Sequence, residues 1–264
     1  MENKRAILVV SFGTSAPAAA LDIEALENAL GAEFEDCEIR RAFTSGMIIK
    51  KLMERDGIKI DTVSEALLKL ADEGYTNVTV QPTYVINGYE YELMKNEAES
   101  YRNRFSSLEV GMPLLTYDSD YEKTAELLVS ETPELSENTA AVFVGHGTEH
   151  SANSAYAALA YRLAAQGHKN CLVGTVEAYP DIAEIKRALS ELGVNKVMLK
   201  PFLIVAGEHA LNDICGEDEY SWKSMLEEEG YEVICDNRGL GRYSGIQALF
   251  AEHIERASEI MYDG

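Results

Sequence analysis

Apolar residues along this chain form short runs that alternate with segments of helical periodicity. Each run holds about four to eight residues rich in Val, Ile, Leu and Ala, as in strands that are buried on both faces. The segments between the runs place apolar residues three or four positions apart, which is typical of helices with one buried face. The alternation predicts an α/β fold in which parallel sheets carry helices on both faces. The predicted strands are residues 6–12, 37–43, 77–83, 108–112, 140–145, 171–176, 196–203 and 232–235, and the predicted helices are residues 17–30, 62–73, 89–105, 119–130, 152–165, 180–192, 220–229 and 244–261.

The first predicted strand occurs twice. Residues 6–15 read A-I-L-V-V-S-F-G-T-S, and the second copy, which begins at residue 140, reads A-A-V-F-V-G-H-G-T-E-H. Aligning Gly13 with Gly147 sets the copies 134 positions apart and places Phe12 opposite His146. A histidine at a position where the repeated framework accepts another side chain is a candidate for function.

A second repeat involves the third strand of each half. Residues 74–90 align with residues 193–209 at a separation of 119 positions, which places Glu90 opposite His209. The shorter separation is explained if the first half carries about fifteen extra residues in the long connection at residues 47–61.

The boundary between the copies lies in a polar linker at residues 131–139, which contains Pro133 and several acidic residues. We therefore predict an N-terminal α/β half at residues 1–133 and a C-terminal α/β half at residues 134–264. The C-terminal half carries most of the candidate metal ligands described below.

Composition narrows the classes of partner. The 264 residues are 46% hydrophobic and carry a formal net charge of −22, which argues against a nucleic-acid groove and against binding to an anionic membrane surface. The first apolar run is far shorter than the ~20 residues of a membrane span, and no cleavage pattern follows it. We expect a cytoplasmic protein without a membrane anchor, and the sequence leaves open whether it forms a homo-oligomer.

The four cysteines include no C-x-x-C pair. Cys37 and Cys171 are 134 positions apart and occupy equivalent strand positions of the repeat. We expect these two residues, together with Cys215 and Cys235, to be buried reduced thiols.

Metal-binding side chains follow the predicted strands of the second half. His146, Glu177 and His209 each stand after a different strand, and the repeat places Glu90 opposite His209. Because the carboxyl ends of parallel strands meet at one edge of a sheet, we expect these four residues to line one site. Two imidazoles and a carboxylate form an incomplete ligand set that suits Co²⁺, Ni²⁺, Fe²⁺ or Zn²⁺ and leaves positions open for a reaction on the metal.

Two alternatives stay open at this point. Residues 146–150 read H-G-T-E-H and fit the inverted zinc-protease pattern H-x-x-E-H, with Glu149 as the base. That chemistry needs both histidines on one face of a helix, whereas Gly147 interrupts the turn that follows the strand. The second alternative is a non-catalytic protein that binds a metal or another ligand in the same cleft.

Six motifs carry a resemblance to a known family. They are V-V-S-F-G-T-S at residues 9–15, R-A-F-T-S-G-M-I-I at 41–49, I-N-G at 86–88, G-H-G at 145–147, V-E-A-Y-P at 176–180 and A-G-E-H-A-L-N-D at 206–213. Together they resemble the anaerobic cobalt chelatases of cobalamin biosynthesis, class II enzymes that insert Co²⁺ into sirohydrochlorin. The resemblance covers nearly the whole chain, and its second and sixth motifs are the specific ones.

The resemblance implies two flavodoxin-like, Rossmann-like halves that face each other across an active-site cleft. It also implies that His146, Glu177 and His209 hold the metal and that Glu90 faces the same space, so we expect His146, His209 and Glu90 to act in catalysis. The implied activity is that of a sirohydrochlorin cobaltochelatase, acting on sirohydrochlorin or a precorrin-2 form of it. Cobalt is then a substrate and no cofactor is permanently bound, although the ligand set leaves nickel or iron insertion open.

The implied partners are a tetrapyrrole and a divalent metal ion. We expect the carboxylates of the tetrapyrrole to meet backbone amides and hydroxyls at Ser11, Thr14, Thr44 and Ser45. Members of the family often carry a histidine a few residues before I-N-G, where this chain has Tyr84. The resemblance therefore carries no metal-delivery role over to that position.

Overall fold

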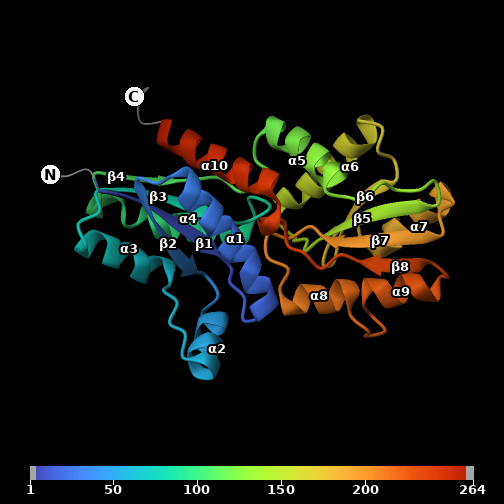
Figure 1. The fold of residues 1–264 in the computed structure, drawn as a ribbon, viewed down its shortest axis with the longest axis horizontal. Coiled ribbons are helices and arrows are strands. Elements are labelled where there is room, and N and C mark those ends of the chain that lie inside the picture. Colours follow the sequence, from blue (N-terminus) through green and yellow to red (C-terminus); the bar gives the residue numbers. More distant parts are fainter. Residues whose placement is uncertain (1–3, 260–264) are drawn as a thin grey trace.

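Two parallel sheets with the same strand order form the centre of the molecule (Figure 1). The computed structural model describes residues 4–259, except for the side chains of residues 208–210 and 259. The first sheet has the order β2-β1-β3-β4 and the second has the order β6-β5-β7-β8, so the sequence repeat is a repeat of the fold. The prediction of an α/β fold with two similar halves is confirmed. The strands are β1 (Arg5–Ser11), β2 (Cys37–Phe43), β3 (Asn77–Pro82), β4 (Ser107–Val110), β5 (Thr139–Gly145), β6 (Cys171–Thr175), β7 (Lys196–Pro201) and β8 (Glu232–Cys235).

Helices connect the strands and cover both faces of each sheet. The α-helices are α1 (Pro17–Glu33), α2 (Gly46–Asp56), α3 (Val63–Asp72), α4 (Tyr89–Glu99), α5 (Asp118–Ser130), α6 (Ser154–Ala165), α7 (Ile182–Leu192), α8 (Glu208–Cys215), α9 (Trp222–Glu228) and α10 (Ser244–Glu259). Short 3-10 helices are η1 (Arg102–Arg104), η2 (Ser151–Asn153) and η3 (Leu240–Arg242).

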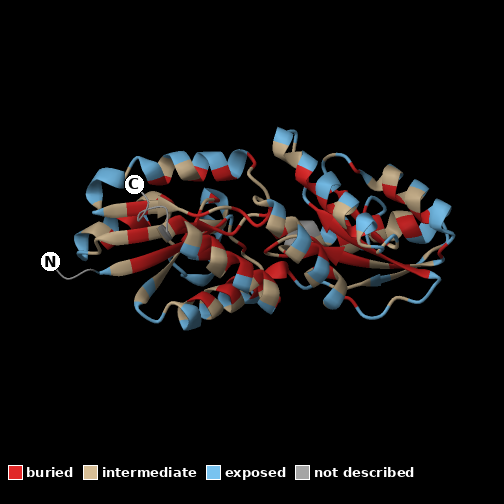
Figure 2. Ribbon diagram, turned by 90° about the horizontal axis from the view of Figure 1, so that it is seen from above, coloured by how far each residue is buried: buried red, intermediate tan, exposed pale blue. Residues whose placement is uncertain are grey.

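The central strands are buried on both faces, as their continuous apolar runs predict. In β1, Ile7 and Val9 belong to one core cluster, whereas Leu8 and Val10 belong to another on the opposite face. Strand β5 alternates in the same way between two clusters. Figure 2 shows these strands as the most completely buried part of each half. Side chains that alternate along a strand therefore fill two separate cores.

The two halves exchange their last helices. Helix α5 follows the first sheet but packs against α6, beside the second sheet, and α10 follows the second sheet but packs against α1, β3 and β4 (Figure 1). Leu128 of α5, Phe143 of β5 and Ile246 of α10 consequently belong to one continuous core cluster. Both sheets share this core, and the domain division at residue 133 stays a prediction.

Two helices occur where the sequence analysis expected none. Helix α2 occupies the long connection after β2, and α8 begins where a turn was expected after β7. Helix α2 buries only Leu52 along its length, so little of its stability comes from packing against the core. Its ends are defined by Ser45, which accepts a hydrogen bond from the amide of Ile48, and by Gly57, which adopts a left-handed conformation.

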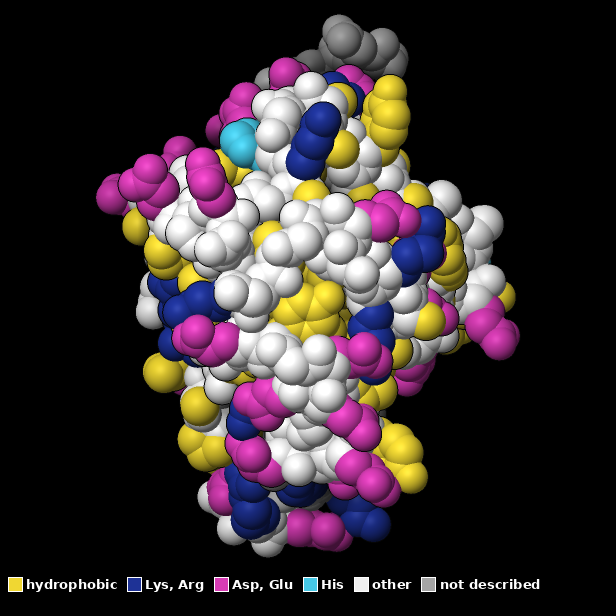
Figure 3. All heavy atoms as spheres, turned by 90° about the vertical axis from the view of Figure 1, so that its right-hand side faces the viewer, with side chains coloured by type: hydrophobic (Ala, Val, Ile, Leu, Met, Phe, Trp, Pro, Cys, Tyr) yellow, Lys and Arg dark blue, Asp and Glu magenta, His cyan; other side chains and the backbone are white. Residues whose placement is uncertain are grey.

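The surface carries acidic and basic side chains in mixed positions. On the end of the molecule shown in Figure 3, acidic side chains gather in several places with basic side chains between them, and no continuous basic stripe is seen on that face. Within residues 4–259, no helix combines the length and the apolar composition that crossing a bilayer requires.

Candidate active site

A cleft opens between the two halves at the carboxyl ends of their strands. Its volume is about 770 Å³, which is typical of a small-molecule site. The segments after β1, β3, β5, β6 and β7 line it, together with the start of α2. The polar side chains along its walls are Thr14, Ser15, Ser45, Lys51, Thr83, Tyr84, Tyr89, Glu90, His146, Thr148, Glu149, Tyr156 and Glu177.

His146 and Glu177 lie next to each other where β5 and β6 end. The imidazole Nδ1 is 3.4 Å from the carboxylate Oε2, and each side chain is 61% exposed. The backbone supports this pairing, because the amide of Glu177 donates a hydrogen bond of 2.9 Å to the carbonyl oxygen of His146. Nδ1 also lies 3.1 Å from the carbonyl oxygen of Gly147. A neutral ring with its proton on Nδ1 therefore keeps the Nε2 lone pair for a metal.

Phe12 and His146, which occupy equivalent positions of the repeat, are each followed by a glycine for a steric reason. Gly147 has a φ of +86°, and a Cβ there would lie 2.9 Å from the amide nitrogen of Ala178. Gly13 has a φ of +100°, and its Cβ would lie 2.5 Å from the ring of Phe43. The two loops thus share one backbone shape, and Phe12 lines the cleft where the second copy presents His146.

Glu90 and His209 stand in the first turns of α4 and α8, the helices that follow β3 and β7. Glu90 is exposed and lines the cleft. The side chain of His209 lies outside the described residues, but the residue that caps its helix, Gly207, lines the cleft. Among the described side chains, no group of three or more His, Cys, Asp or Glu is close enough to hold a metal. The structure brings His146 and Glu177 together, and the metal-binding role of His209 stays a prediction.

Two of the hydroxyls predicted to meet the substrate lie behind the cleft wall. Ser11 is 2% exposed, and its Oγ shares a hydrogen bond of 2.8 Å with Oγ1 of Thr83. Thr44 Oγ1 lies 3.1 Å from the hydroxyl of Tyr84. Of these residues, Thr83 and Tyr84 are the ones that line the cleft.

The other two predicted hydroxyls lie on the cleft wall itself. Thr14 Oγ1 accepts a hydrogen bond of 3.1 Å from the amide of Ala16, and Ser45 Oγ accepts one of 3.4 Å from the amide of Ile48. All four hydroxyls therefore already hold the loops after β1 and β2 in shape. Their contact with substrate carboxylates stays a prediction.

One cation, Lys51, and three phenols, those of Tyr84, Tyr89 and Tyr156, line the cleft and were not predicted as site residues. Lys51 extends from α2, in the stretch at residues 47–61 that the repeat predicts to be an inserted connection, although M-I-I-K-K-L-M has helical spacing. Burial raises the pKa of Tyr84 far above its usual value, despite the opposing hydrogen bond with Thr44. Burial likewise raises the pKa of Tyr156 to about 12. These two phenols are thus neutral at physiological pH and do not act as bases.

His150 bridges the two halves instead of joining His146 on a helix. Its Nδ1 accepts a hydrogen bond of 3.1 Å from the amide of Ala152, where it caps η2. Its Nε2 lies 3.5 Å from a carboxylate oxygen of Glu92, and its ring packs edge-on against Tyr89 at 4.7 Å, both on α4. Because β5 ends before His146 and η2 begins after His150, the inverted zinc-protease arrangement is excluded.

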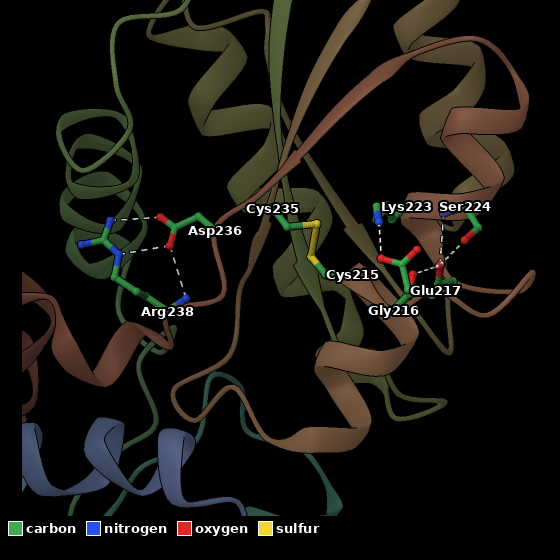
Figure 4. The surroundings of a disulfide bond; sticks show 9 residues. Cys215, Gly216, Glu217, Lys223, Ser224, Cys235, Asp236 and Arg238 are labelled. Atoms are coloured by element: carbon green, nitrogen blue, oxygen red, sulfur yellow. Dashed lines mark hydrogen bonds and ion pairs between the residues drawn. A yellow bond between two sulfur atoms is a disulfide. The ribbon is translucent and has the colours of Figure 1, made fainter.

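The prediction of four reduced thiols is wrong for one pair. Cys215 at the end of α8 and Cys235 at the end of β8 form a disulfide (Figure 4), and their Cα atoms are 6.1 Å apart. The residues are 20 positions apart in the chain, so their approach depends on how α8 packs beside the sheet. Cys37 and Cys171 are free thiols as predicted, but only Cys171 is buried, whereas Cys37 is half-buried. Burial raises the pKa of Cys171 to about 11.

Comparison with known proteins relates the whole chain to metal chelatases. The sequence profile described as cobalt chelatase (CbiK) matches residues 5–259. The chain is 42% identical over 255 residues to the sirohydrochlorin cobaltochelatase of Salmonella typhimurium, covering 96% of each chain. It is 34% identical over 264 residues to the sirohydrochlorin cobaltochelatase CbiKC of Nitratidesulfovibrio vulgaris, covering 99% of this chain and 93% of that one.

Solved structures with the same fold include two of the chelatase SirB. The Bacillus subtilis protein with Fe³⁺ has a TM-score of 0.68 at 16% identity, with 98% of each chain covered. The sirohydrochlorin chelatase SirB of Bacillus subtilis subspecies spizizenii, in complex with cobalt, has a TM-score of 0.66 at 14% identity, with 97% of this chain and 96% of that one covered. At these identities the likeness establishes a shared fold of two similar halves.

Proposed function

Because this chain belongs to the cobalt chelatase (CbiK) family, we propose that it inserts Co²⁺ into sirohydrochlorin, the metal-insertion step of anaerobic cobalamin biosynthesis. The observation that carries the proposal is the cleft, in which His146 and Glu177 adjoin at the strand ends of one half and face the walls of the other. The substrates are a tetrapyrrole and a divalent metal ion. Cobalt is consumed in the reaction, and no permanently bound cofactor is needed.

The reaction exchanges one metal ion for two protons. As Co²⁺ binds the four ring nitrogens, the two pyrrole N–H groups each lose a proton, and these protons must leave the cleft. His146 and His209 hold the incoming metal through neutral imidazole nitrogens, and Glu177 ligates the metal or orients the His146 ring. Glu90, at the cleft wall opposite, accepts a proton or guides the cation.

The ligand roles are tested by single substitutions of the two histidines. We expect His146→Ala and His209→Ala each to reduce the rate of cobalt insertion at least about 100-fold, since each removes a metal ligand. The measurement is the change in the visible spectrum of sirohydrochlorin after addition of Co²⁺ under anaerobic conditions. His168→Ala is the matched control, because His168 lies in the turn before β6, at the other end of the sheet.

Undiminished insertion by either variant would contradict the assignment of that ligand. Catalytic turnover separates the proposed enzyme from a metal or tetrapyrrole store. An enzyme converts many equivalents of sirohydrochlorin, whereas a store stops at one equivalent per binding site. The ligand set by itself does not identify the preferred metal, because its affinities follow the general order of the divalent ions. Competition among Co²⁺, Ni²⁺ and Fe²⁺ in the same assay identifies it.

A further inference from the structure

A buried carboxylate of the first half holds the loop that leads to His209 in the second half. Asp22, in the middle of α1, is 0% exposed. Its Oδ2 accepts a hydrogen bond of 2.9 Å from the amide of Ala206, which lies 184 positions further along the chain. Its Oδ1 accepts a hydrogen bond of 2.5 Å from Nε of Arg242, 220 positions further along. The charge of a buried carboxylate is thus compensated by a guanidinium and an amide from the other half.

The chain around Asp22 is shaped to admit this carboxylate. A Cβ on Gly239 would lie 2.2 Å from Oδ2 of Asp22, and a Cβ on Gly241 would lie 2.3 Å from its carbonyl oxygen. Between these glycines, the amide of Leu240 donates a hydrogen bond of 2.8 Å to the carbonyl of Leu203. The segment from residue 239 to 241 therefore packs against Asp22 and against the β7–α8 loop at the same time.

The loop at residues 203–207 also makes apolar contacts with the first half. Val205 packs against the small apolar cluster that contains Ile23, Phe43 and Leu52. The amide of Gly207 then donates a hydrogen bond of 3.0 Å to the carbonyl of Val205, and Gly207 caps α8. Any shift of this loop therefore moves the first turn of α8 relative to the rest of the cleft.

We propose that Asp22 is a positioning residue for metal insertion. By binding the amide of Ala206 and the side chain of Arg242, its carboxylate fixes the β7–α8 loop against α1 and thereby sets where His209 stands relative to His146. This inference rests on the proposed chelatase function. Asp22 acts through the loop and does not line the cleft.

The test compares two buried carboxylates that differ in what they hold. Asp22→Asn removes the charge and replaces one acceptor oxygen with an amide nitrogen. Asp120→Asn makes the same change at another carboxylate that is 0% exposed and binds two backbone amides and a side chain. Its partners are residues 116, 117 and 253 instead of the β7–α8 loop. The readouts are the dissociation constant of Co²⁺ from the substrate-free protein, followed by its visible absorption, and the thermal unfolding midpoint.

We expect Asp22→Asn to weaken Co²⁺ binding about 10- to 100-fold, the effect typical of residues that orient a metal ligand, whereas Asp120→Asn lowers the unfolding midpoint without this loss. In a His209→Ala background, Asp22→Asn should weaken Co²⁺ binding no further, because its effect passes through His209. A merely structural role would instead give equal Co²⁺ affinity in Asp22→Asn and Asp120→Asn, or additive losses with His209→Ala, and either result would overturn the inference.

Gly239→Ala provides a second test if Asp22→Asn does not fold. Its Cβ displaces the same carboxylate oxygen, and we expect a comparable loss of Co²⁺ affinity; a folded Gly239→Ala variant with wild-type affinity would refute the inference. Failure of the proposed function has a different signature. In that case the wild type inserts no cobalt, or His209→Ala binds Co²⁺ as tightly as the wild type does.

Discussion

Single residues give the cleft more negative than positive charge. Glu90, Glu149 and Glu177 line it, whereas Lys51 is the one Lys or Arg among its described lining residues. Carboxylates concentrate divalent cations, and an ammonium group attracts the carboxylates of a tetrapyrrole. We therefore expect the carboxylates to attract the metal ion, and Lys51 on α2 to attract the acidic substituents of the tetrapyrrole.

We expect Lys51→Gln to raise the KM for sirohydrochlorin about 2- to 5-fold, because an exposed charge pair contributes roughly 0.5 to 1 kcal/mol. The value of kcat should change little, since Lys51 meets the substrate away from the metal. The measurement is initial-rate kinetics at low and at high salt, and the difference from the wild type should shrink as salt screens the charge.

Lys50→Gln is the matched control for this substitution. Lys50 is the neighbouring residue on α2, its side chain is 74% exposed, and it pairs with Glu54 at 3.7 Å. It does not line the cleft. An equal rise of KM in both variants would mean that the overall charge of α2 matters and that Lys51 has no local contact with the substrate.

At the scale of elements, α8 is a short helix that is fixed at both ends. Before the helix begins, Asp22 binds the amide of Ala206 in the β7–α8 loop. At the end of the helix, the disulfide between Cys215 and Cys235 ties α8 to β8 (Figure 4). Eight residues form too short a helix to be stable by themselves, so these attachments and the burial of Ile214 supply its stability. The disulfide therefore belongs to the framework that supports the turn carrying His209.

Reduction of the disulfide should lower the free energy of unfolding by about 3 kcal/mol, because the bond closes a loop of 20 residues in the unfolded chain. The paired variant Cys215→Ser/Cys235→Ser should show the same loss without a reductant. Urea unfolding with and without a thiol reductant measures both.

Cys37→Ser is the control for the disulfide, because Cys37 is a half-buried free thiol. This variant should keep its sensitivity to the reductant, whereas the paired variant should lose it. If the reductant shifts the wild type and the paired variant equally, the stabilising bond is not the one between Cys215 and Cys235.

At the scale of the whole molecule, the exchange of α5 and α10 joins the two halves through a shared core. Asp120 of α5 and His253 of α10 meet at this exchange, with Nε2 of the imidazole 3.2 Å from Oδ2 of the carboxylate. Nδ1 of His253 lies 3.0 Å from the carbonyl oxygen of Met112. Both ring nitrogens of His253 thus lie within hydrogen-bonding distance of an oxygen atom, and the imidazole links α10 to α5 and to the segment after β4.

The carboxyl of Asp120 makes the free energy of unfolding depend on pH. Burial by itself would raise the pKa of Asp120, but hydrogen bonds from His253 and from the amides of Tyr117 and Thr116 outweigh burial and hold the pKa below its usual value. A lowered folded-state pKa means that the ionised carboxylate stabilises the fold above its unfolded pKa of about 3.9. This contribution is lost as the pH falls through the folded value.

We therefore expect Asp120→Asn to be about 1 to 3 kcal/mol less stable than the wild type at pH 7, with a difference that narrows as the pH falls below about 4. Urea unfolding between pH 7 and pH 2.5 measures it. Asp118→Asn is the control, because Asp118 is an 87% exposed partner of Arg162 on the surface and should contribute little. A stability gap for Asp120→Asn that stays constant over this range would contradict the assigned role.

The local sequence pattern was sufficient to predict most of the fold and two of the four candidate site residues, His146 and Glu177. The strands were predictable because their apolar runs are short, rich in Val, Ile, Leu and Ala, and alternate with segments of helical periodicity. The strand order, which is the same in both sheets, was not predicted. His146 and Glu177 were predictable because both directly follow strands that pair side by side. Helix α2 was not predicted although its apolar residues have helical spacing, because the repeat marks residues 47–61 as an insertion without a counterpart in the second half.

The sequence by itself determined the strands, most of the helices and the side chains at the strand ends, since each of these depends on neighbours within a few positions. Comparing the chain with itself revealed the duplication. The tertiary structure alone decided which distant groups meet. The disulfide joins residues 20 positions apart, and Asp22 binds partners 184 and 220 positions away. Such contacts depend on how the two sheets and their exchanged helices pack around a shared core, and a periodic pattern along one chain does not encode that relative placement.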